Sequence, residues 1–145
     1  MTDSIDHVLE KWHCVMASGT SEGLFELLSP ACTFWSPVVH TPQHGRDITF
    51  LYLAAASQVF ATDFHYVREV VQVDSAMLEF ECVIDGIHIN GVDIIRVESG
   101  QIVDFKVMVR PLKAVYKVHE QMMSMPETMR RPRPDDPKRA DDTFD

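Results

Sequence analysis

The chain has 145 residues, of which 46% are hydrophobic and 24% are charged, a balance typical of a single globular domain. Its 13 basic and 22 acidic residues give a formal net charge of −9 at pH 7, which argues against nucleic acid or an anionic membrane as a partner. It has no apolar run of the roughly 18 residues that a membrane helix needs, and its N-terminus lacks the features of a signal peptide, so we expect a cytoplasmic protein.

Helical spacing dominates the first part of the sequence. Apolar residues recur every three or four positions over residues 4–18, which predicts an amphipathic helix that Gly19 closes. Thr20 or Ser21 can cap a short second helix. Pro30 is expected to end that helix, because proline has no N–H to donate and clashes with the preceding turn.

A strand is predicted over residues 31–37, and the segment "VVHTPQHG" that follows it is predicted to be a loop. Gly45 then opens a third helix. The apolar face of this helix is predicted to carry Ile48, Leu51, Tyr52 and Ala55.

From Phe64 onward the apolar residues recur at every second position, which is typical of strands. The turn signals "VDS", "DG" and "ESG" divide this region into four predicted strands at about 64–73, 76–84, 87–98 and 101–110. Because these connections are short, consecutive strands should pair antiparallel.

Pro111 starts a last predicted helix, and the composition changes after it. Residues 126–145 contain four prolines, six acidic residues and five basic residues, and almost nothing apolar. We therefore expect one domain over residues 1–125. Residues 126–145 are expected to be a polar, proline-rich tail that is either disordered or an arm resting on a partner subunit.

Three helices followed by a run of paired strands predict an α+β fold. A single sheet buries one face under its helices, but several of these strands are apolar on both faces, as Val92 and Ile94 illustrate. The second face should therefore meet another surface, and a homodimer partner is the simplest candidate.

This order of elements, with the phrases "HGRDI" and "VDIIRVESGQI", resembles the SnoaL-like branch of the nuclear transport factor 2-like superfamily over about residues 5–116. The resemblance implies a cone-shaped, curved antiparallel sheet with three N-terminal helices that enclose a pocket, plus a C-terminal helix. The superfamily includes ketosteroid isomerases, polyketide cyclases, scytalone dehydratase and limonene epoxide hydrolase, besides binding proteins with no chemistry. The fold therefore predicts a pocket better than it predicts a reaction.

Asp93 is the strongest candidate for a functional residue, because an ionised carboxylate is rare on an apolar strand and is costly when it faces a core. Strand alternation places it on one face with Gly91, whose small size leaves room for a ligand or for close backbone approach. The phrase "VDIIRVESGQI" resembles the part of bacterial ketosteroid isomerase that carries its oxyanion-hole aspartic acid. That resemblance implies that Asp93 donates a hydrogen bond to a developing enolate. The alternative is a structural ion pair with Arg110 or Arg68.

Two positions depart from that isomerase. Ser36, in "TFWSPVV", occupies the place of its proton-shuttling aspartate, and a serine cannot carry a substrate proton as a carboxylate does. Trp12 falls on its first-helix tyrosine, and an indole N–H can donate a hydrogen bond but does not titrate usefully. Steroid isomerisation by the known route is therefore poorly supported.

Histidines and a second acid supply the other titratable candidates. His40, in a proline-bounded loop, is the best proton partner for Asp93, although an exposed loop histidine explains it equally well. His65 starts a strand and can point inward, while Glu81 is either a second pocket carboxylate or part of a solvated edge. His40 and His44 lack a third ligand, so we expect neither a metal nor another cofactor.

Two functions are consistent with these residues. The first is a cofactor-independent isomerase, cyclase or dehydratase that acts on a hydrophobic or polyketide-like small molecule, with Asp93 and His40 as catalytic residues. The second is a binding domain for an apolar small ligand without chemistry, which the serine at position 36 favours. A weaker third is a scaffold whose tail docks on another protein. In either of the first two, the residues predicted to line the ligand pocket are Trp12, Trp35, Ser36, Tyr52, His65, Glu81 and Phe105.

Overall fold

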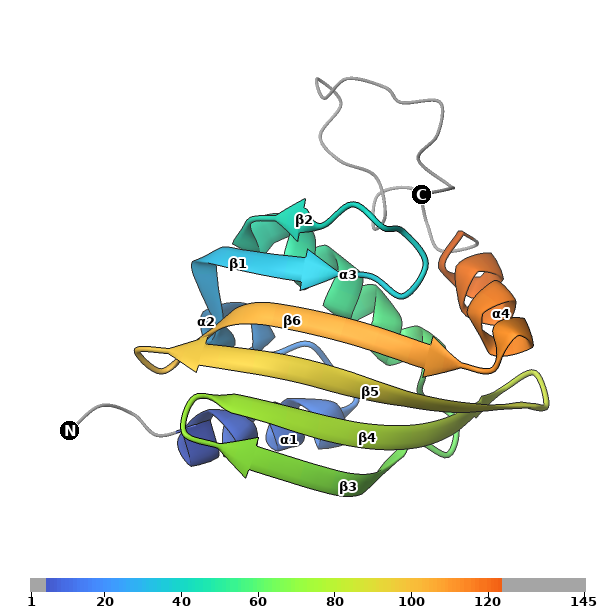
Figure 1. Cartoon of the computed structure of the whole chain (residues 1–145), viewed down its shortest axis with the longest axis horizontal. Coiled ribbons are helices and arrows are strands. Elements are labelled where there is room, and N and C mark those ends of the chain that lie inside the picture. The colour runs from blue at the N-terminus through green and yellow to red at the C-terminus, as the bar shows by residue number, and fades with distance from the viewer. Residues whose placement is uncertain (1–4, 124–145) are drawn as a thin grey trace.

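Four helices and six strands make up residues 5–123, the part of the chain that the computed structural model describes (Figure 1). The helices are α1 (Ile5–Ser18), α2 (Leu24–Leu27), α3 (Arg46–Val59) and α4 (Leu112–Met123). The strands are β1 (Leu28–Trp35), β2 (Gln43–His44), β3 (His65–Gln72), β4 (Ser75–Ile84), β5 (Ile87–Glu98) and β6 (Gln101–Arg110).

The strands form one mixed, curved sheet with the order β2-β1-β6-β5-β4-β3 (Figure 1). Strands β3 to β6 follow one another and pair antiparallel, as predicted. Strand β1 instead pairs with β6 in parallel, so the sheet is mixed. The physical reason is that α3 and four strands separate β1 from β6 along the chain, and no tight turn fixes their relative direction.

The three N-terminal helices cover one face of the sheet, and α4 lies beside the end of β6 (Figure 1). We call the helix-covered face the inner face and the opposite one the outer face. The residues of α1 that are buried against the inner face, all of them predicted from helical spacing, are Ile5, Val8, Leu9, Trp12 and Val15. The predicted α+β fold with a helix-covered curved sheet is therefore confirmed.

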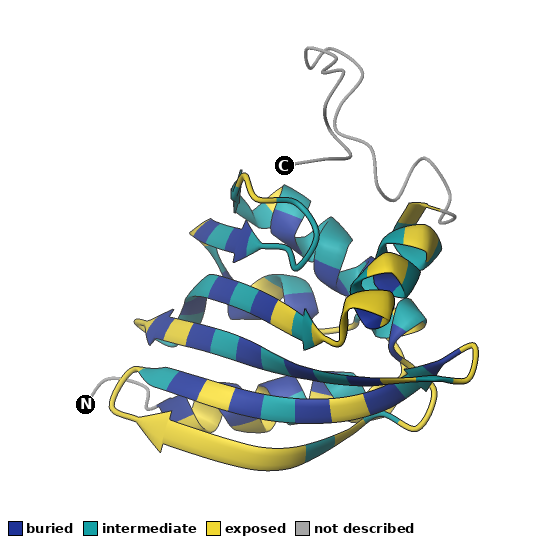
Figure 2. Cartoon of the chain, turned by 45° about the vertical axis from the view of Figure 1, so that its right-hand side comes forward, coloured by how far each residue is buried: buried dark blue, intermediate teal, exposed yellow. Residues whose placement is uncertain are grey.

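Burial alternates along the central strands, whereas the edge strand β3 is exposed along most of its length (Figure 2). In β4 the buried residues of the inner face include Leu78, Phe80 and Cys82, and the residues of the outer face include Met77, Glu79 and Glu81. The same alternation in β5 decides where the candidate site lies, because it determines which side chains face the helices.

Helix α3 is rotated relative to the prediction from its apolar residues. Ala55 is buried as expected, but Thr49 and Leu53 are also buried while Leu51 and Tyr52 are only partly covered. Thr49 can occupy the core because its hydroxyl donates a hydrogen bond to the carbonyl oxygen of Gly45 at 2.8 Å.

Pro30 does not end a helix, contrary to the prediction, but lies inside β1. The pairing of β1 with β6 is irregular between Leu28 and Thr33. Proline is tolerated at such an irregularity, because the ladder hydrogen bond that its missing N–H would have donated is not required there.

The predicted tail, residues 126–145, lies outside the described residues. Between residues 5 and 123, no helix has the length and apolar character needed to span a bilayer.

Candidate functional site

Asp93 lies on the inner face in the middle of β5, where Leu78 of β4 and Val107 of β6 flank it. Its two neighbours are buried, and Asp93 itself is only 6% exposed. A carboxyl group in such an apolar setting requires either a partner or a proton, because burying an unpaired charge is costly.

The partner is a tyrosine that the sequence did not single out. The hydroxyl of Tyr66, on β3, donates a hydrogen bond to Oδ2 of Asp93 at 3.0 Å. The indole N–H of Trp12, on α1, donates in turn to the Tyr66 hydroxyl at 2.9 Å. A helix, an edge strand and a central strand thus meet in one chain of hydrogen bonds, which we call the Trp12–Tyr66–Asp93 relay.

The second carboxyl oxygen of Asp93, Oδ1, is not covered by this relay. Tyr66 is the one hydrogen-bond donor to Asp93 within residues 5–123. Over the same residues, no fully buried side-chain oxygen or nitrogen lacks a hydrogen-bond partner. Oδ1 must therefore account for some of the surface that Asp93 retains, and it can receive a hydrogen-bonding group from a ligand.

The structure excludes the ion pair that was the alternative explanation for Asp93. Arg68 faces outward, and its Nε donates to Oε1 of Glu79 at 2.8 Å. Arg110 borders a hollow on the outer face of the sheet, on the side opposite Asp93.

Burial raises the pKa of Asp93 to about 7, and the hydrogen bond from Tyr66 acts in the opposite direction. Burial, reinforced by the negative charge of Asp93, also raises the pKa of the Tyr66 hydroxyl above its ordinary value. Tyr66 therefore keeps its proton at neutral pH, whereas Asp93 is poised between its neutral and ionised forms. A carboxyl group in that condition can donate or accept a proton near pH 7.

A row of aromatic rings runs along the inner face next to the relay. The ring centroids of Trp12 and Phe105 are 5.1 Å apart, and those of Phe105 and Phe34 are 6.3 Å apart. Phe34 stacks on Tyr52 with ring centroids 5.4 Å apart. Trp12, Tyr52 and Phe105, three of the residues predicted to line the pocket, thus belong to one inner aromatic row.

Gly91 does not leave open space beside Asp93. A Cβ atom added at Gly91 would overlap the ring of Phe80 and would lie 2.7 Å from the carbonyl oxygen of Met108. Of the two explanations offered for this glycine, close approach is the correct one, and the ring of Phe80 occupies the space.

Trp35 lies on the outer face and not with the inner aromatic row. Its indole N–H donates to Oδ1 of Asp104 at 2.9 Å, and the ammonium group of Lys106 lies 4.8 Å from its ring centroid. Strand alternation explains this placement, because Trp35 directly follows the inward-facing Phe34.

Ser36 and His40 both lie in the segment between β1 and β2. The hydroxyl oxygen of Ser36 accepts hydrogen bonds from the backbone N–H groups of Val38 and Val39, at 3.0 and 3.3 Å, and so stabilises a turn. His40 is exposed. The structure therefore does not bring either residue into hydrogen-bond contact with Asp93.

His65 and Glu81 lie opposite each other on β3 and β4, at the surface. Nε2 of His65 lies 3.7 Å from Oε1 of Glu81, and their side chains are 60% and 52% exposed. Glu81 has the opposite orientation from the inward-facing Phe80 and Cys82, so it is not a second carboxylate beside Asp93.

Strand alternation does not predict that Tyr66 faces the core, because β3 contains a bulge. Tyr66 pairs with Phe80, whereas Arg68 pairs with the adjacent Glu79, so Val67 is an extra residue in the strand. Strict alternation would have placed Tyr66 and Arg68 on the same face. The available signal was the pairing itself, which sets Tyr66 opposite a residue that faces the core.

One ionisable pair borders the relay. His13, next to Trp12 on α1, has its Nε2 3.0 Å from Oε2 of Glu69 on β3, and both side chains are 36% exposed. The His13 ring also contacts the ring of Tyr66 edge-on, with centroids 5.2 Å apart. This pair joins α1 to the edge strand on the solvent side of Tyr66.

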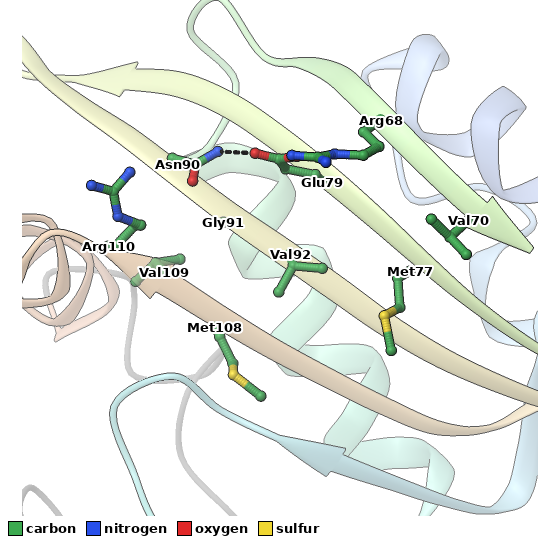
Figure 3. A pocket seen from close by; sticks show the side chains of 10 residues that line it. All are labelled: Arg68, Val70, Met77, Glu79, Asn90, Gly91, Val92, Met108, Val109 and Arg110. Carbon is green, nitrogen blue, oxygen red and sulfur yellow. Dashed lines mark hydrogen bonds and ion pairs between the residues drawn. The ribbon is translucent and has the colours of Figure 1, made fainter.

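The outer face carries a hollow of about 400 Å³ over β3 to β6 (Figure 3). Met77, Val92 and Met108 contribute apolar surface to it. At one end, Glu79 accepts hydrogen bonds from Arg68 at 2.8 Å and from the side-chain amide of Asn90 at 2.9 Å. This hollow is separated from Asp93 by the sheet itself.

No group of three or more histidine, cysteine, aspartate or glutamate side chains that could hold a metal ion occurs in the described range 5–123.

No family model matches the sequence, and no curated protein matches it at a significant level. Among solved structures, a steroid delta-isomerase from Pseudomonas aeruginosa is similar, with 35% identity and a TM-score of 0.79 over 81% of this chain and 88% of that chain. A protein with a cystatin-like fold from Silicibacter pomeroyi has 30% identity and a TM-score of 0.75 over 81% of this chain and 83% of that chain. An NTF2-like protein of unknown function from Mesorhizobium loti shares the fold at 22% identity and a TM-score of 0.67, over 73% of this chain and 90% of that chain.

The first two similarities extend over more than four fifths of the chain. Together with the observed topology, they agree with the resemblance found in the sequence. The chain belongs to the nuclear transport factor 2-like superfamily.

Proposed function

We propose that this protein binds a small apolar molecule against its inner aromatic row and meets a carbonyl oxygen of that molecule with the carboxyl group of Asp93. The observation that carries the proposal is the state of Asp93 among residues 5–123: it is buried, it has no ion-pair partner, and it is bonded to Tyr66 through one of its two oxygens. The buried rings of Trp12 and Phe105 keep the surroundings of this carboxyl group apolar, and the partly exposed ring of Tyr52 in the same row offers flat surface for the body of the ligand.

The chemistry that this arrangement favours is stabilisation of an enolate. When a proton leaves the carbon next to a carbonyl group, negative charge develops on the carbonyl oxygen. A neutral carboxyl group fixed in an apolar site can donate a hydrogen bond to that oxygen and lower the barrier. The reaction class is therefore a cofactor-independent isomerisation, cyclisation or dehydration. The SnoaL-like assignment and a polyketide-like substrate remain predictions.

A second residue must accept the proton that leaves the carbon. Ser36 is engaged in a turn and is not a base. His40 is the candidate base, and because it is exposed in the segment before β2, this role stays a prediction.

Binding without chemistry is the second candidate, favoured by the same two observations about Ser36 and His40. It assigns Asp93 and the aromatic row to ligand recognition alone. The two candidates differ in one measurable property, which is whether a bound ketone loses a proton from the carbon beside its carbonyl group.

That exchange provides the test. We expect the protein to accelerate deuterium incorporation into the methyl group of 2-acetylnaphthalene in D₂O, followed by NMR. Replacing the carboxyl group in Asp93→Asn should lower the rate by about a hundredfold or more. Asp104→Asn, the same change on the outer face, is the matched control and should leave the rate unchanged. Binding of the ketone with no exchange above the buffer rate would favour the binding domain and contradict catalysis.

We also propose that a second copy of this chain covers the outer face of the sheet. Val70, Met77 and Met108 are 56%, 52% and 49% exposed there, and together with Val92 they form a continuous apolar surface around the hollow. Large exposed apolar patches of this kind are typical of interfaces.

A further inference from the structure

The hydroxyl of Tyr66 has two hydrogen-bonding neighbours but only one proton. Trp12 approaches it with an indole N–H at 2.9 Å, and an indole N–H can only donate. The Tyr66 oxygen must therefore accept from Trp12, which leaves its single proton for Oδ2 of Asp93 at 3.0 Å. Because Trp12 is only 3% exposed, water does not readily replace it in this role.

This direction restricts where a proton can sit on neutral Asp93. A proton on Oδ2 would point at the Tyr66 oxygen, which already faces the indole N–H, and the proton of Tyr66 would then lose its acceptor. A proton on Oδ1 leaves both hydrogen bonds of the relay intact. Oδ1 is also the oxygen that the described residues leave uncovered.

We propose that Trp12 is a positioning residue: its N–H fixes the direction of the Tyr66 hydroxyl and thereby places the proton of neutral Asp93 on Oδ1, facing the ligand. Trp12 places this proton already in the unliganded protein, and only the identity of the ligand rests on the proposed function. A proton on Oδ1 implies that the site recognises a hydrogen-bond acceptor, such as a ketone, when Asp93 is neutral. It recognises a donor, such as an alcohol, when Asp93 is ionised.

Among the residues that the structure describes, few other charges lie near this relay. On the β3 and α1 side, Glu69 and His13 are paired with each other, at the solvent edge of Tyr66. On the β4 and β6 side, Asp93 faces Leu78 and Val107, which do not titrate. The ionisation of Asp93 can therefore be followed through its own carboxyl signal.

The test of positioning needs no ligand. We would titrate the protein labelled with ¹³C at the aspartate carboxyl carbon and assign the Asp93 signal by its loss in Asp93→Asn. Tyr66→Phe removes the donor to the carboxylate and should raise the pKa of Asp93 by about one unit or more. Trp12→Phe keeps that donor but no longer polarises or orients it, and should raise the pKa of Asp93 by about half a unit. Trp35→Phe removes an indole donor on the outer face and should change nothing.

A purely structural role for Trp12 gives a different result. Loss of packing would admit water, stabilise the carboxylate and lower the pKa of Asp93. A pKa that falls or stays the same in a folded Trp12→Phe variant would overturn the proposal. If that variant does not fold, β-(3-benzothienyl)alanine can replace Trp12 in the Trp35→Phe background, because it keeps the ring shape and removes the N–H. The same outcomes then apply.

Binding separates this inference from the proposed function. The probes are 2-acetylnaphthalene and 1-(2-naphthyl)ethanol, a ketone and an alcohol of nearly identical shape, measured by calorimetry at pH 6. Trp12→Phe should weaken binding of the ketone by about fivefold and leave binding of the alcohol nearly unchanged, because only the ketone needs the proton on Oδ1. Equal weakening of both probes would contradict proton positioning. If the pKa shifts occur but neither probe binds the wild-type protein, the ligand proposal fails and the positioning role of Trp12 stands.

Discussion

At the scale of the residue, Asp93 shows how an isolated acid in an apolar strand can indicate a site. The sequence sufficed to single it out, because an aspartate between valine and isoleucine conflicts with the surrounding pattern. It did not suffice to identify Tyr66, because a bulge at Val67 changes which side of β3 faces inward. Local composition predicts which residue is unusual, whereas its partner depends on register, which composition does not determine.

The buried state of Asp93 predicts a dependence of stability on pH. The pKa of Asp93 is about 7 in the folded protein and 3.8 in its ordinary state, so the folded protein binds more protons between these values. The stabilising effect of the neutral group is therefore complete below pH 3.8 and is lost as the pH rises through about 7. Over the whole pH range between the two pKa values, the loss amounts to at most about 4 kcal/mol in the free energy of unfolding.

Asp93→Asn should remove this dependence, because a carboxamide keeps an acceptor for Tyr66 and carries no charge. We expect urea unfolding to show that the free energy of unfolding of the variant, relative to that of the wild type, increases from pH 5 to pH 8. Comparing the two proteins at each pH cancels the titration of all other groups. Parallel stability curves would mean that Asp93 is already ionised, or solvated, at pH 5.

At the scale of the element, the sequence predicted the strands well wherever tight turns separate them. The turn residues Asp85 and Gly86 both have positive φ values, as do Ser99 and Gly100, and these are conformations that short hairpins require. Turn residues of this kind can be recognised in the sequence, because they act locally. The parallel pairing of β1 with β6 cannot be recognised in this way, because no short connection joins the two strands.

The pairing of β4 with β5 leads to a prediction about Gly91. An added methyl group would overlap the ring of Phe80 and press on the backbone carbonyl of Met108. Gly91→Ala should therefore destabilise the protein by about 1–3 kcal/mol, measured by denaturant unfolding. Adding Phe80→Leu should make the cost of the alanine smaller in a double-mutant cycle. Full additivity of the two changes would show that Phe80 is not the obstacle.

At the scale of the whole molecule, one sheet separates two different apolar surfaces. The helices cover the inner face and give it the relay and the aromatic row, while the outer face keeps its methionines and valines exposed (Figure 2). The sequence anticipated this two-sided character, because both parities of the strands are apolar. It grouped Trp35, His65 and Glu81 with the inner residues. Alternation alone separates Trp35 from Phe34 and Glu81 from Phe80, once the inward side of each strand is known. His65 lies at the start of β3, where a bulge interrupts the alternation.

The outer face carries the last prediction, which concerns assembly. If a second copy covers this face, the protein in solution should have twice the 16.5 kDa mass of the chain by sedimentation equilibrium. Met77→Glu should weaken this dimer by tenfold or more, because a two-fold axis buries the new carboxylate twice, next to an apolar partner. Val73→Glu makes a similar change at a residue that is 89% exposed in the turn between β3 and β4, and it should leave the dimer intact. A monomeric wild-type protein, or equal effects of the two substitutions, would show that the outer face is not the interface. Dissociation by Leu112→Glu alone would instead place the contact on α4, where Leu112 is 69% exposed.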